Sequence, residues 1–199
     1  SSTSRGLGDV YKRQGCSSEV IHRIDGLLIS GGPDIDPRLY GQENGPHTKE
    51  IYPEQDTSEI ALIKSAIEKN IPLLCICRGF QLLCTIYGGE LYQHLPETEG
   101  YENHGGWDGE VTEHGVDVIE GTKLQQIMGT HINANSTHHQ GVFNAGNLSI
   151  SAYSSHDNLI EAVEIEGLKF CIGVQWHPER IKHTSLYRAF IESARGSSL

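Results

Sequence analysis

Short apolar runs alternate with helical patterns in the first half of this chain. Residues 24–32 read IDGLLISGG and residues 73–76 read LLCI. Apolar runs of this length, bounded by glycine or proline, predict buried strands. Between them, the apolar positions from 60 to 67 share one helical face behind a capping-box-like start at 56–59. We therefore expect a strand, a helix from about residue 56 and a second strand.

The second half of the chain is rich in predicted strands. An alternating stretch covers residues 110–119, further strands are predicted at 148–153, 160–165 and 170–175, and helices are predicted at 78–87 and 183–194. Strands that alternate with helices form parallel sheets covered on both faces, and strands joined by short turns add antiparallel pairs. The predicted fold class is α/β, a three-layer α/β/α arrangement with a mostly parallel sheet and a small antiparallel addition.

Residues 1–14 differ from the rest of the chain, because they are rich in serine, glycine and arginine and lack an apolar period. We interpret them as a non-native or disordered tail, and residues 15–199 as a single domain. The net charge of −11 argues against nucleic acid and anionic membranes as partners. Five cysteines, an odd number without a paired framework, favour reduced thiols in the cytoplasm.

Cys77 stands where a predicted strand turns into a predicted helix. Free N–H groups and the dipole at a helix start favour an anion, so we expect this thiol to have a lowered pKa and to act as a nucleophile. Gly79 lets the turn close, and the N–H of Arg78 can donate to the oxyanion of a tetrahedral intermediate. The alternative is that Cys77 is a buried core residue like Cys75, since strands commonly bury cysteine.

His177 and Glu179 follow the last predicted strand, in the sequence HPE. Open α/β sheets bind ligands at the carboxyl ends of their strands. The histidine can exchange protons with a nucleophile, and the glutamate can orient the imidazole through its far nitrogen. A loop histidine beside a solvated glutamate is the alternative. Pairing with Cys77 favours catalysis, because each motif supplies what the other lacks.

Two further segments permit more than one interpretation. Gly31 and Gly32 end the first strand, where they form either an ordinary turn or a second oxyanion donor, the N–H of Gly32. Residues 135–140 read NSTHHQ, which fits a surface loop. Adjacent histidines point apart on a strand, and no acidic or cysteine ligand lies close by in sequence. We therefore expect no metal site in this segment.

Five motifs occur in the order typical of one family: SGGPDIDP (30–37), ICRGFQ (76–81), GGELY (88–92), NSTHHQ (135–140) and GVQWHPE (173–179). Together they resemble the class I glutamine amidotransferase-like superfamily and, within it, the γ-glutamyl-γ-aminobutyrate hydrolase family. The cysteine and HPE motifs are common to the superfamily. The arginine after the cysteine, the DIDP loop and the HHQ segment narrow the resemblance to the family.

The resemblance implies a catalytic triad, with Cys77 as nucleophile, His177 as general base and acid, and Glu179 as the orienting acid. It implies that the oxyanion N–H groups come from Gly32 and Arg78. The side chains expected to hold the glutamyl head are Gln81, His139 and Gln140.

The activity implied by the resemblance is hydrolysis of the amide bond of small γ-glutamyl compounds, such as γ-glutamyl-γ-aminobutyrate, through a thioester. It implies a role in polyamine catabolism, a small-molecule substrate as the partner, and neither a metal nor an organic cofactor. The oligomeric state is left open, with a homodimer as one possibility. Two alternatives remain: a glutaminase subunit that passes ammonia to a synthetase, and an inactive binding module.

The chain departs from the family pattern in two places. Family members have a strand and a helix before the strand at 24–32, where this chain has residues 1–14 and a short bridge. We therefore expect a truncated fragment that lacks a central strand and folds poorly alone. Family members also have an Arg-Asp pair where this chain has Gln55 and Asp56, so a local salt bridge is expected to be lost.

Overall fold

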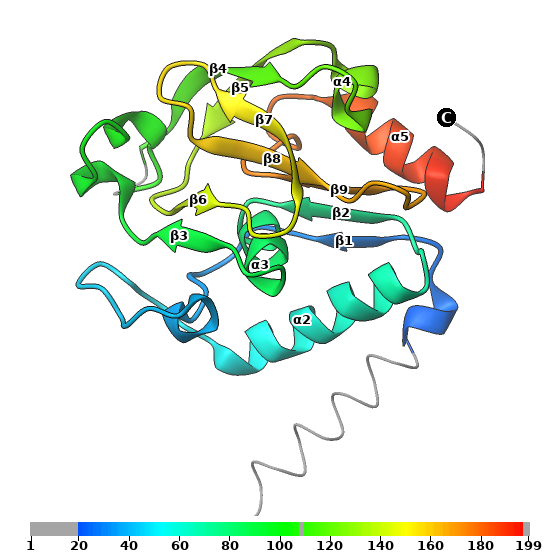
Figure 1. Ribbon diagram of the computed structural model, residues 1–199, viewed down its shortest axis with the longest axis horizontal. Helices are drawn as coiled ribbons and strands as arrows, with labels where there is room; N and C mark the ends of the chain where they lie inside the picture. Colours follow the sequence, from blue (N-terminus) through cyan, green and yellow to red (C-terminus); the bar gives the residue numbers. More distant parts are fainter. Residues whose placement is uncertain (1–19, 108–109, 197–199) are drawn as a thin grey trace, which may run out of the picture.

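The computed structural model describes residues 20–107 and 110–196. Within these residues nine strands form one sheet with helices on both faces (Figure 1). The strands are β1 (Leu27–Ile29), β2 (Leu73–Ile76), β3 (Glu90–Tyr92), β4 (Thr112–Val118), β5 (His131–Ser136), β6 (Gly141–Asn144), β7 (Ser149–Ser154), β8 (Ile160–Glu164) and β9 (Cys171–Val174). The helices are α2 (Pro53–Glu68), α3 (Arg78–Ile86), α4 (Lys123–Met128) and α5 (Thr184–Ala194), with 3₁₀ turns η1 (Ile21–Arg23), η2 (Pro37–Tyr40), η3 (Leu95–Glu97) and η4 (Glu102–His104).

The α/β fold class is confirmed, but the expected proportion of parallel strands is wrong. The sheet order is β1-β2-β9-β8-β7-β4-β5, with β3 paired to β6 and β6 to β8. Among the described strands only β1, β2 and β9 pair in parallel. Short turns join β7 to β8 and β8 to β9, and strands joined by a tight turn must run antiparallel. The parallel part is therefore the smaller one.

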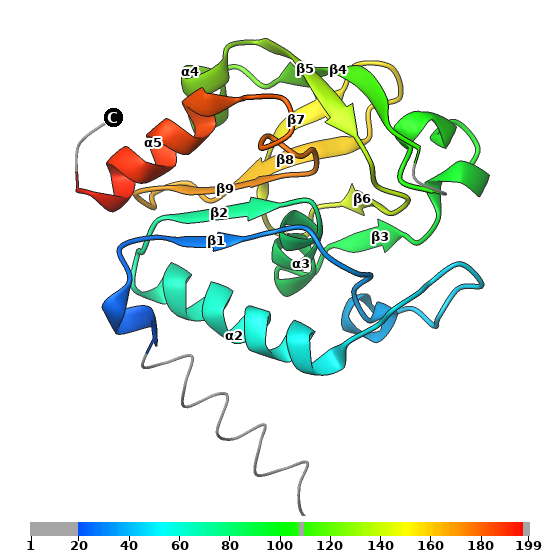
Figure 2. The same cartoon turned by 180° about the vertical axis from the view of Figure 1, so that it is seen from behind.

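The sheet separates two apolar cores, because successive side chains of a strand point to opposite faces. Leu73 and Cys75 of β2 lie in the core shared with α2 and α3. Leu74 and Ile76 lie in the core shared with α4 and α5. Seen from behind, α2 and α3 again lie on one side of the sheet and α4 and α5 on the other (Figure 2). The three-layer arrangement follows from this alternation.

The parallel pairing of β2 and β9 brings distant parts of the sequence to one place. Ile76 pairs with Val174, so the two strands end at the same level. The pairing continues one residue further, where the N–H of Cys77 donates to the carbonyl of Val174 at 2.8 Å. Residues that follow both strands therefore emerge side by side at the carboxyl edge of the sheet.

Helix α2 begins three residues earlier than the capping-box pattern predicts. It starts at Pro53. Proline is favoured in the first helical turn because the N–H groups there have no partner within the helix, so nothing is lost when proline lacks one. Asp56 consequently lies inside the helix, where it is only 1% exposed. Its carboxylate accepts from the N–H of Asp36 and pairs with Arg78. Gln55, which stands where family members have the arginine, donates to Glu59 at 2.9 Å, so the expected loss of a salt bridge with that arginine stays a prediction.

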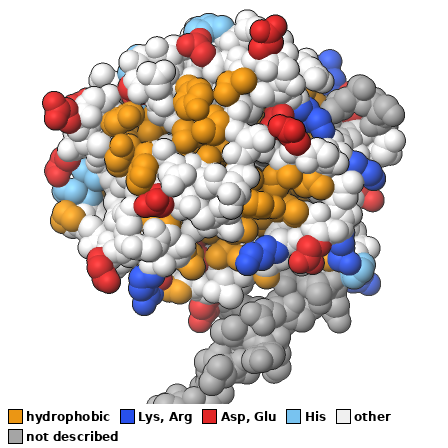
Figure 3. Space-filling view, viewed as in Figure 1, with side chains coloured by type: hydrophobic (Ala, Val, Ile, Leu, Met, Phe, Trp, Pro, Cys, Tyr) orange, Lys and Arg blue, Asp and Glu red, His pale blue; other side chains and the backbone are white. Residues whose placement is uncertain are grey.

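Strand β1 stands at one end of the sheet path in the described part of the chain, and its Leu28 is 40% exposed. Acidic side chains are spread over the face shown in Figure 3, with apolar groups exposed between them. No described helix is long and apolar enough to cross a bilayer. The tail predicted at residues 1–14 lies outside the described residues.

Candidate active site

Cys77 occupies a sharp turn between β2 and α3. Its φ of 52° and ψ of −108° are unusual for a residue with a side chain, and such strain is typical of functional sites. The turn is held from both sides, since the N–H of Cys77 donates to β9 and its carbonyl accepts from Gln81 at 3.0 Å. The side chain is 9% exposed and reaches the wall of a cleft.

Close packing behind the turn explains why Gly79 follows Arg78. A side-chain carbon at Gly79 would lie 2.5 Å from the carbonyl oxygen of Ile29, so only glycine lets α3 approach β1 this closely. The Arg78 side chain is buried and points away from the cleft, into ion pairs with Asp56 and Glu59 of α2. Arg78 can therefore serve the site through its backbone and not through its guanidinium.

His177 and Glu179 follow β9 at the same edge of the sheet. Nδ1 of His177 lies 2.6 Å from a carboxylate oxygen of Glu179. The backbone of His177 is held twice by Asn135, whose amide donates to its carbonyl at 3.2 Å and accepts from its N–H at 3.0 Å. Because a carboxylate can only accept when ionised, Nδ1 carries a proton in this pair and Nε2 is the free base.

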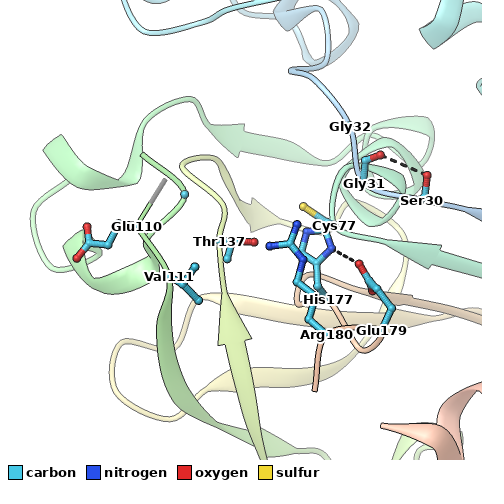
Figure 4. Close-up of a pocket in the computed structure, with 11 residues that line it drawn as sticks. Ser30, Gly31, Gly32, Cys77, Glu110, Val111, Thr137, His177, Glu179 and Arg180 are labelled. Carbon is cyan, nitrogen blue, oxygen red and sulfur yellow. Dashed lines mark hydrogen bonds and ion pairs between the residues drawn. The ribbon is translucent and has the colours of Figure 1, made fainter. Parts of the chain in front are cut away.

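The loop after β1 completes the cleft, as Figure 4 shows with the Cys77 sulfur beside the His177 ring. A side-chain carbon at Gly31 would lie 3.5 Å from Nε2 of His177 and 3.6 Å from Cβ of Cys77. A similar carbon at Gly32 would lie 3.0 Å from Cδ of Arg78. The two glycines, the thiol and the imidazole therefore surround one space, in a cleft of about 490 Å³.

The expectation of a lowered pKa for Cys77 is wrong. Burial dominates and raises the pKa of the thiol to about 12, because the thiolate would lose its hydration. The N–H of Arg78 and the nearby charge of Arg180 act in the opposite direction, but they do not outweigh burial. The side-chain amide of Gln175 also lies 3.6 Å from the sulfur. The resting cysteine is a protonated thiol that needs a base.

The three residues expected to hold the glutamyl head are not among those that line the cleft. The Gln81 amide donates to the carbonyl of Gln140 at 3.2 Å and to Oε1 of Gln175 at 3.1 Å. His139 lies against Asp34, with 2.9 Å between Nε2 and a carboxylate oxygen. Gln81 therefore supports the amide that contacts the Cys77 sulfur, and its predicted contact with substrate stays a prediction.

Several residues that line the cleft were not singled out from the sequence: Ser30, Gly106, Glu110, Val111, Thr137 and Arg180. They come from four separate loops. Ser30 and Thr137 lie inside two of the five family motifs without a role assigned to them, whereas nothing in the local sequence marks Gly106, Glu110 and Val111. Arg180 directly follows the HPE motif. It is exposed and brings a positive charge to a cleft that already holds a nucleophile and a base.

A three-layer α/β fold with a cysteine turn and a His-Glu pair after a neighbouring parallel strand defines the class I glutamine amidotransferase-like proteins. The model of the Peptidase C26 family matches residues 10–179. Since this match covers most of the sequence, the chain belongs to the Peptidase C26 family.

Proteins with related sequences carry two kinds of name. A Mycobacterium tuberculosis protein with a provisional glutamine amidotransferase name is 37% identical over 183 residues, 92% of this chain and 58% of its own length. The γ-glutamyl-γ-aminobutyrate hydrolase of Escherichia coli K12 is 36% identical over 172 residues, 81% of this chain and 66% of its own length. The chain thus spans less than two thirds of both relatives.

A solved structure supports the fold assignment. The CTPS glutaminase domain of Trypanosoma brucei superposes with a TM-score of 0.62 at 18% identity, over 93% of this chain and 76% of that one. An identity this low supports a shared fold and carries no further information about substrate.

Proposed function

We propose that this protein is a cysteine-dependent hydrolase that cleaves the amide bond of small γ-glutamyl compounds. The observation that carries the proposal is the convergence of Cys77, His177 and the loop of Gly31 and Gly32 on one cleft. The substrate class is supported by the 36% identity to a relative named γ-glutamyl-γ-aminobutyrate hydrolase. Family membership and the strained turn at Cys77 support a covalent mechanism.

The first half of the reaction forms a thioester. The thiol proton passes to Nε2 of His177 while the Cys77 sulfur attacks the γ-carbonyl carbon of the substrate. The raised pKa of the thiol requires this coupling, because free thiolate is scarce at neutral pH. The N–H groups of Gly32 and Arg78 stabilise the oxyanion. The imidazolium then protonates the departing amine as the C–N bond breaks.

The second half of the reaction consumes water. His177, neutral again, accepts a proton from a water molecule that attacks the thioester carbonyl. The C–S bond breaks, the sulfur recovers its proton from the imidazolium, and glutamate leaves. Glu179 keeps Nδ1 protonated and stabilises the imidazolium in both halves, through its 2.6 Å contact.

Arg180 is the residue we propose for recognition of a substrate carboxylate. Its side chain is exposed at the cleft, and in Figure 4 its guanidinium points towards Thr137. A guanidinium binds a carboxylate through two parallel hydrogen bonds. We expect Arg180→Ala to raise KM for a γ-glutamyl substrate about tenfold or more with little change in kcat, since the contact lies away from the reacting carbon.

A panel of γ-glutamyl amides, with glutamine included, tests the proposal by release of glutamate. Cys77→Ala and His177→Ala should each lower kcat by about a thousandfold or more, and Glu179→Gln by less, because it changes orientation and not the proton acceptor. Acid quenching during turnover should yield a glutamyl adduct on Cys77 by mass spectrometry. Substantial hydrolysis by Cys77→Ala would disprove the mechanism.

The same panel separates the alternatives. Release of ammonia from glutamine that far exceeds the release of amine from every other amide would favour a glutaminase subunit, in line with the glutamine amidotransferase name of one relative. Binding of γ-glutamyl compounds without any turnover, and without a Cys77 adduct, would favour an inactive binding module.

A further inference from the structure

Three histidines and a glutamate from separate parts of the fold form a buried cluster that the proposed reaction does not use. His104 ends η4, His114 lies in β4, His138 lies between β5 and β6, and Glu161 lies in β8. The Glu161 side chain is fully buried, and His104 and His138 are almost as inaccessible. Burying an ionised carboxylate is costly unless charged or hydrogen-bonding groups compensate it.

The hydrogen bonds around two of the histidines determine which ring nitrogen is free. Nδ1 of His138 lies 2.8 Å from the carbonyl of Gln140, which can only accept, so Nδ1 carries the proton and Nε2 holds a lone pair. Nε2 of His104 lies 2.7 Å from a carboxylate oxygen of Asp157, so Nδ1 of His104 is the free nitrogen.

The free ring nitrogens of His104 and His138 face the same carboxylate oxygen. Nδ1 of His104 and Nε2 of His138 lie 3.6 and 3.8 Å from the same oxygen of Glu161. The hydroxyl of Ser136 lies 3.0 Å from Nε2 of His138 and 3.4 Å from Nδ1 of His104, but its hydrogen is donated to the carbonyl of His104 at 2.6 Å. The other oxygen of Glu161 has no hydrogen-bond partner among the described residues. Among the described residues, His114 is the side chain within hydrogen-bond distance of Glu161, with its Nε2 3.2 Å from the oxygen that faces both rings. The Ser136 hydroxyl is the one described donor group near the free nitrogens of His104 and His138.

We propose that His104, His138 and Glu161 bind one divalent first-row transition-metal ion, with zinc as the best match. Two imidazoles and one carboxylate are an established zinc ligand set, and a tetrahedral ion with bonds of 2.0–2.1 Å separates its ligands by about 3.4 Å. The three ligand atoms all lie within 4.8 Å of one another. Hard cations such as magnesium or calcium prefer oxygen ligands alone.

The groups around the proposed ligands resemble the outer shell of a metal site. Asp157 and the Gln140 carbonyl accept from the far nitrogens of His104 and His138, as ligating histidines require. His114 lies 3.2 Å from the ligating oxygen of Glu161 and can donate to it. The fourth coordination position is left for water or the Ser136 hydroxyl.

Two other groupings fit an ion less well. In the first, His104 would use Nε2 together with Asp157 and His156. The 2.7 Å distance between Nε2 and Asp157 is a hydrogen bond and is too short for two ligands of one tetrahedral ion. In the second, His47 and His94 lie beside Glu97. Glu97 is largely exposed and pairs with His47 at 2.9 Å, so this group is satisfied without an ion.

The proposed ion would join two segments that form one wall of the cleft. Gly106 and Thr137 line the cleft, two residues after His104 and one residue before His138. The two segments already touch, because a side-chain carbon at Gly106 would lie 2.3 Å from the backbone nitrogen of His138. The ion therefore has a structural role, and its presence does not depend on the activity proposed above.

Cobalt(II) titration and zinc analysis test the proposal on the full chain. We expect one zinc per chain that survives dialysis, and visible cobalt absorption bands that saturate at one equivalent. His138→Ala and Glu161→Gln should each abolish the saturable bands, whereas His131→Ala should keep them. His131 is a matched control, because it lies in β5 but is exposed and pairs with Asp117 outside the cluster. Cys77→Ala should also keep the bands.

A second measurement needs no variant and so is independent of their folding. X-ray absorption at the zinc edge of the unmodified protein should show two imidazoles, oxygen and no sulfur, and removal of zinc by a chelator should lower the melting temperature reversibly. The absence of stoichiometric zinc and cobalt binding would overturn the proposal. So would sulfur in the zinc shell, loss of the bands in Cys77→Ala, or bands that persist in both cluster variants.

Discussion

Gly31 shows how one missing side chain can determine whether a cysteine and a histidine meet. A Cβ at this position would lie 2.8 Å from Cε1 of His177, which is closer than two carbon atoms that are not bonded to each other can approach without a shift. We expect Gly31→Ala to push the imidazole out of line with the Cys77 sulfur and to lower kcat about a hundredfold. The melting temperature should change little, because the added methyl faces the cleft. Wild-type kcat in this variant would disprove the assigned geometry.

The Cys77 thiol gives a second prediction at the scale of single residues. Its pKa of about 12 means that the thiolate fraction of the free protein rises throughout the range from pH 7 to 10. Alkylation by iodoacetamide should therefore accelerate about tenfold per pH unit, since the thiolate is the reacting form. Peptide mapping can follow Cys77 separately from the other described cysteines, which are at most 2% exposed. A rate that is constant above pH 7 would instead show a low-pKa thiolate.

At the scale of elements, the contact between α3 and β1 positions the cysteine turn. Gly79 packs against the backbone of Ile29, and a helix cannot accept a methyl there without moving. We expect Gly79→Ala to cost about 3 kcal/mol of unfolding free energy and to lower activity as well. Gly167→Ala is the control, because a Cβ there meets nothing within 4 Å and only the positive φ of 81° is unfavourable. It should cost about 1 kcal/mol and leave activity unchanged.

Helices α2 and α3 are joined by a buried ion pair. Asp56 and Arg78 are 1% and 2% exposed, whereas Glu59, the second partner of Arg78, is 21% exposed. Asp56→Asn should destabilise the protein by about 3–5 kcal/mol in urea titrations, because it leaves a buried charge incompletely paired. Glu59→Gln should cost clearly less, since water can reach that side. Equal losses in the two variants would contradict this account.

At the scale of the whole molecule, buried thiols should make stability sensitive to alkaline pH. Burial raises the pKa of Cys75 and Cys84, and raises those of Cys77 and Cys171 to about 12. A thiol whose pKa is higher in the folded than in the unfolded protein contributes its full stability below the unfolded-state pKa, which is about 8.5 for cysteine. That contribution is lost as the pH rises from there towards the folded-state pKa. The urea midpoint should therefore fall from pH 8.5 upwards in the presence of a reductant. Cys75→Ala should make that fall less steep.

Much of the fold could be predicted because its signals are local. Strand β2 has the predicted bounds, and α3 and α5 each lie within one residue of theirs. The short strands β3 and β6 were missed, because three or four residues are too few to show an alternation of apolar and polar positions. The start of α2 was misplaced because Asp56 looked like a cap, while its partner Arg78 lies in another helix.

The sequence by itself determined the two halves of the candidate site, since a strand, a turn residue and a helix start each depend on neighbouring residues. Cys77 stands at its predicted turn, and Glu179 contacts His177 as the HPE spacing suggested. Only the tertiary structure decided the antiparallel majority of the sheet, the raised pKa of Cys77 and the meeting of Glu161 with His104 and His138. These properties arise from burial and from contacts between strands far apart in the chain, which a local sequence pattern does not contain.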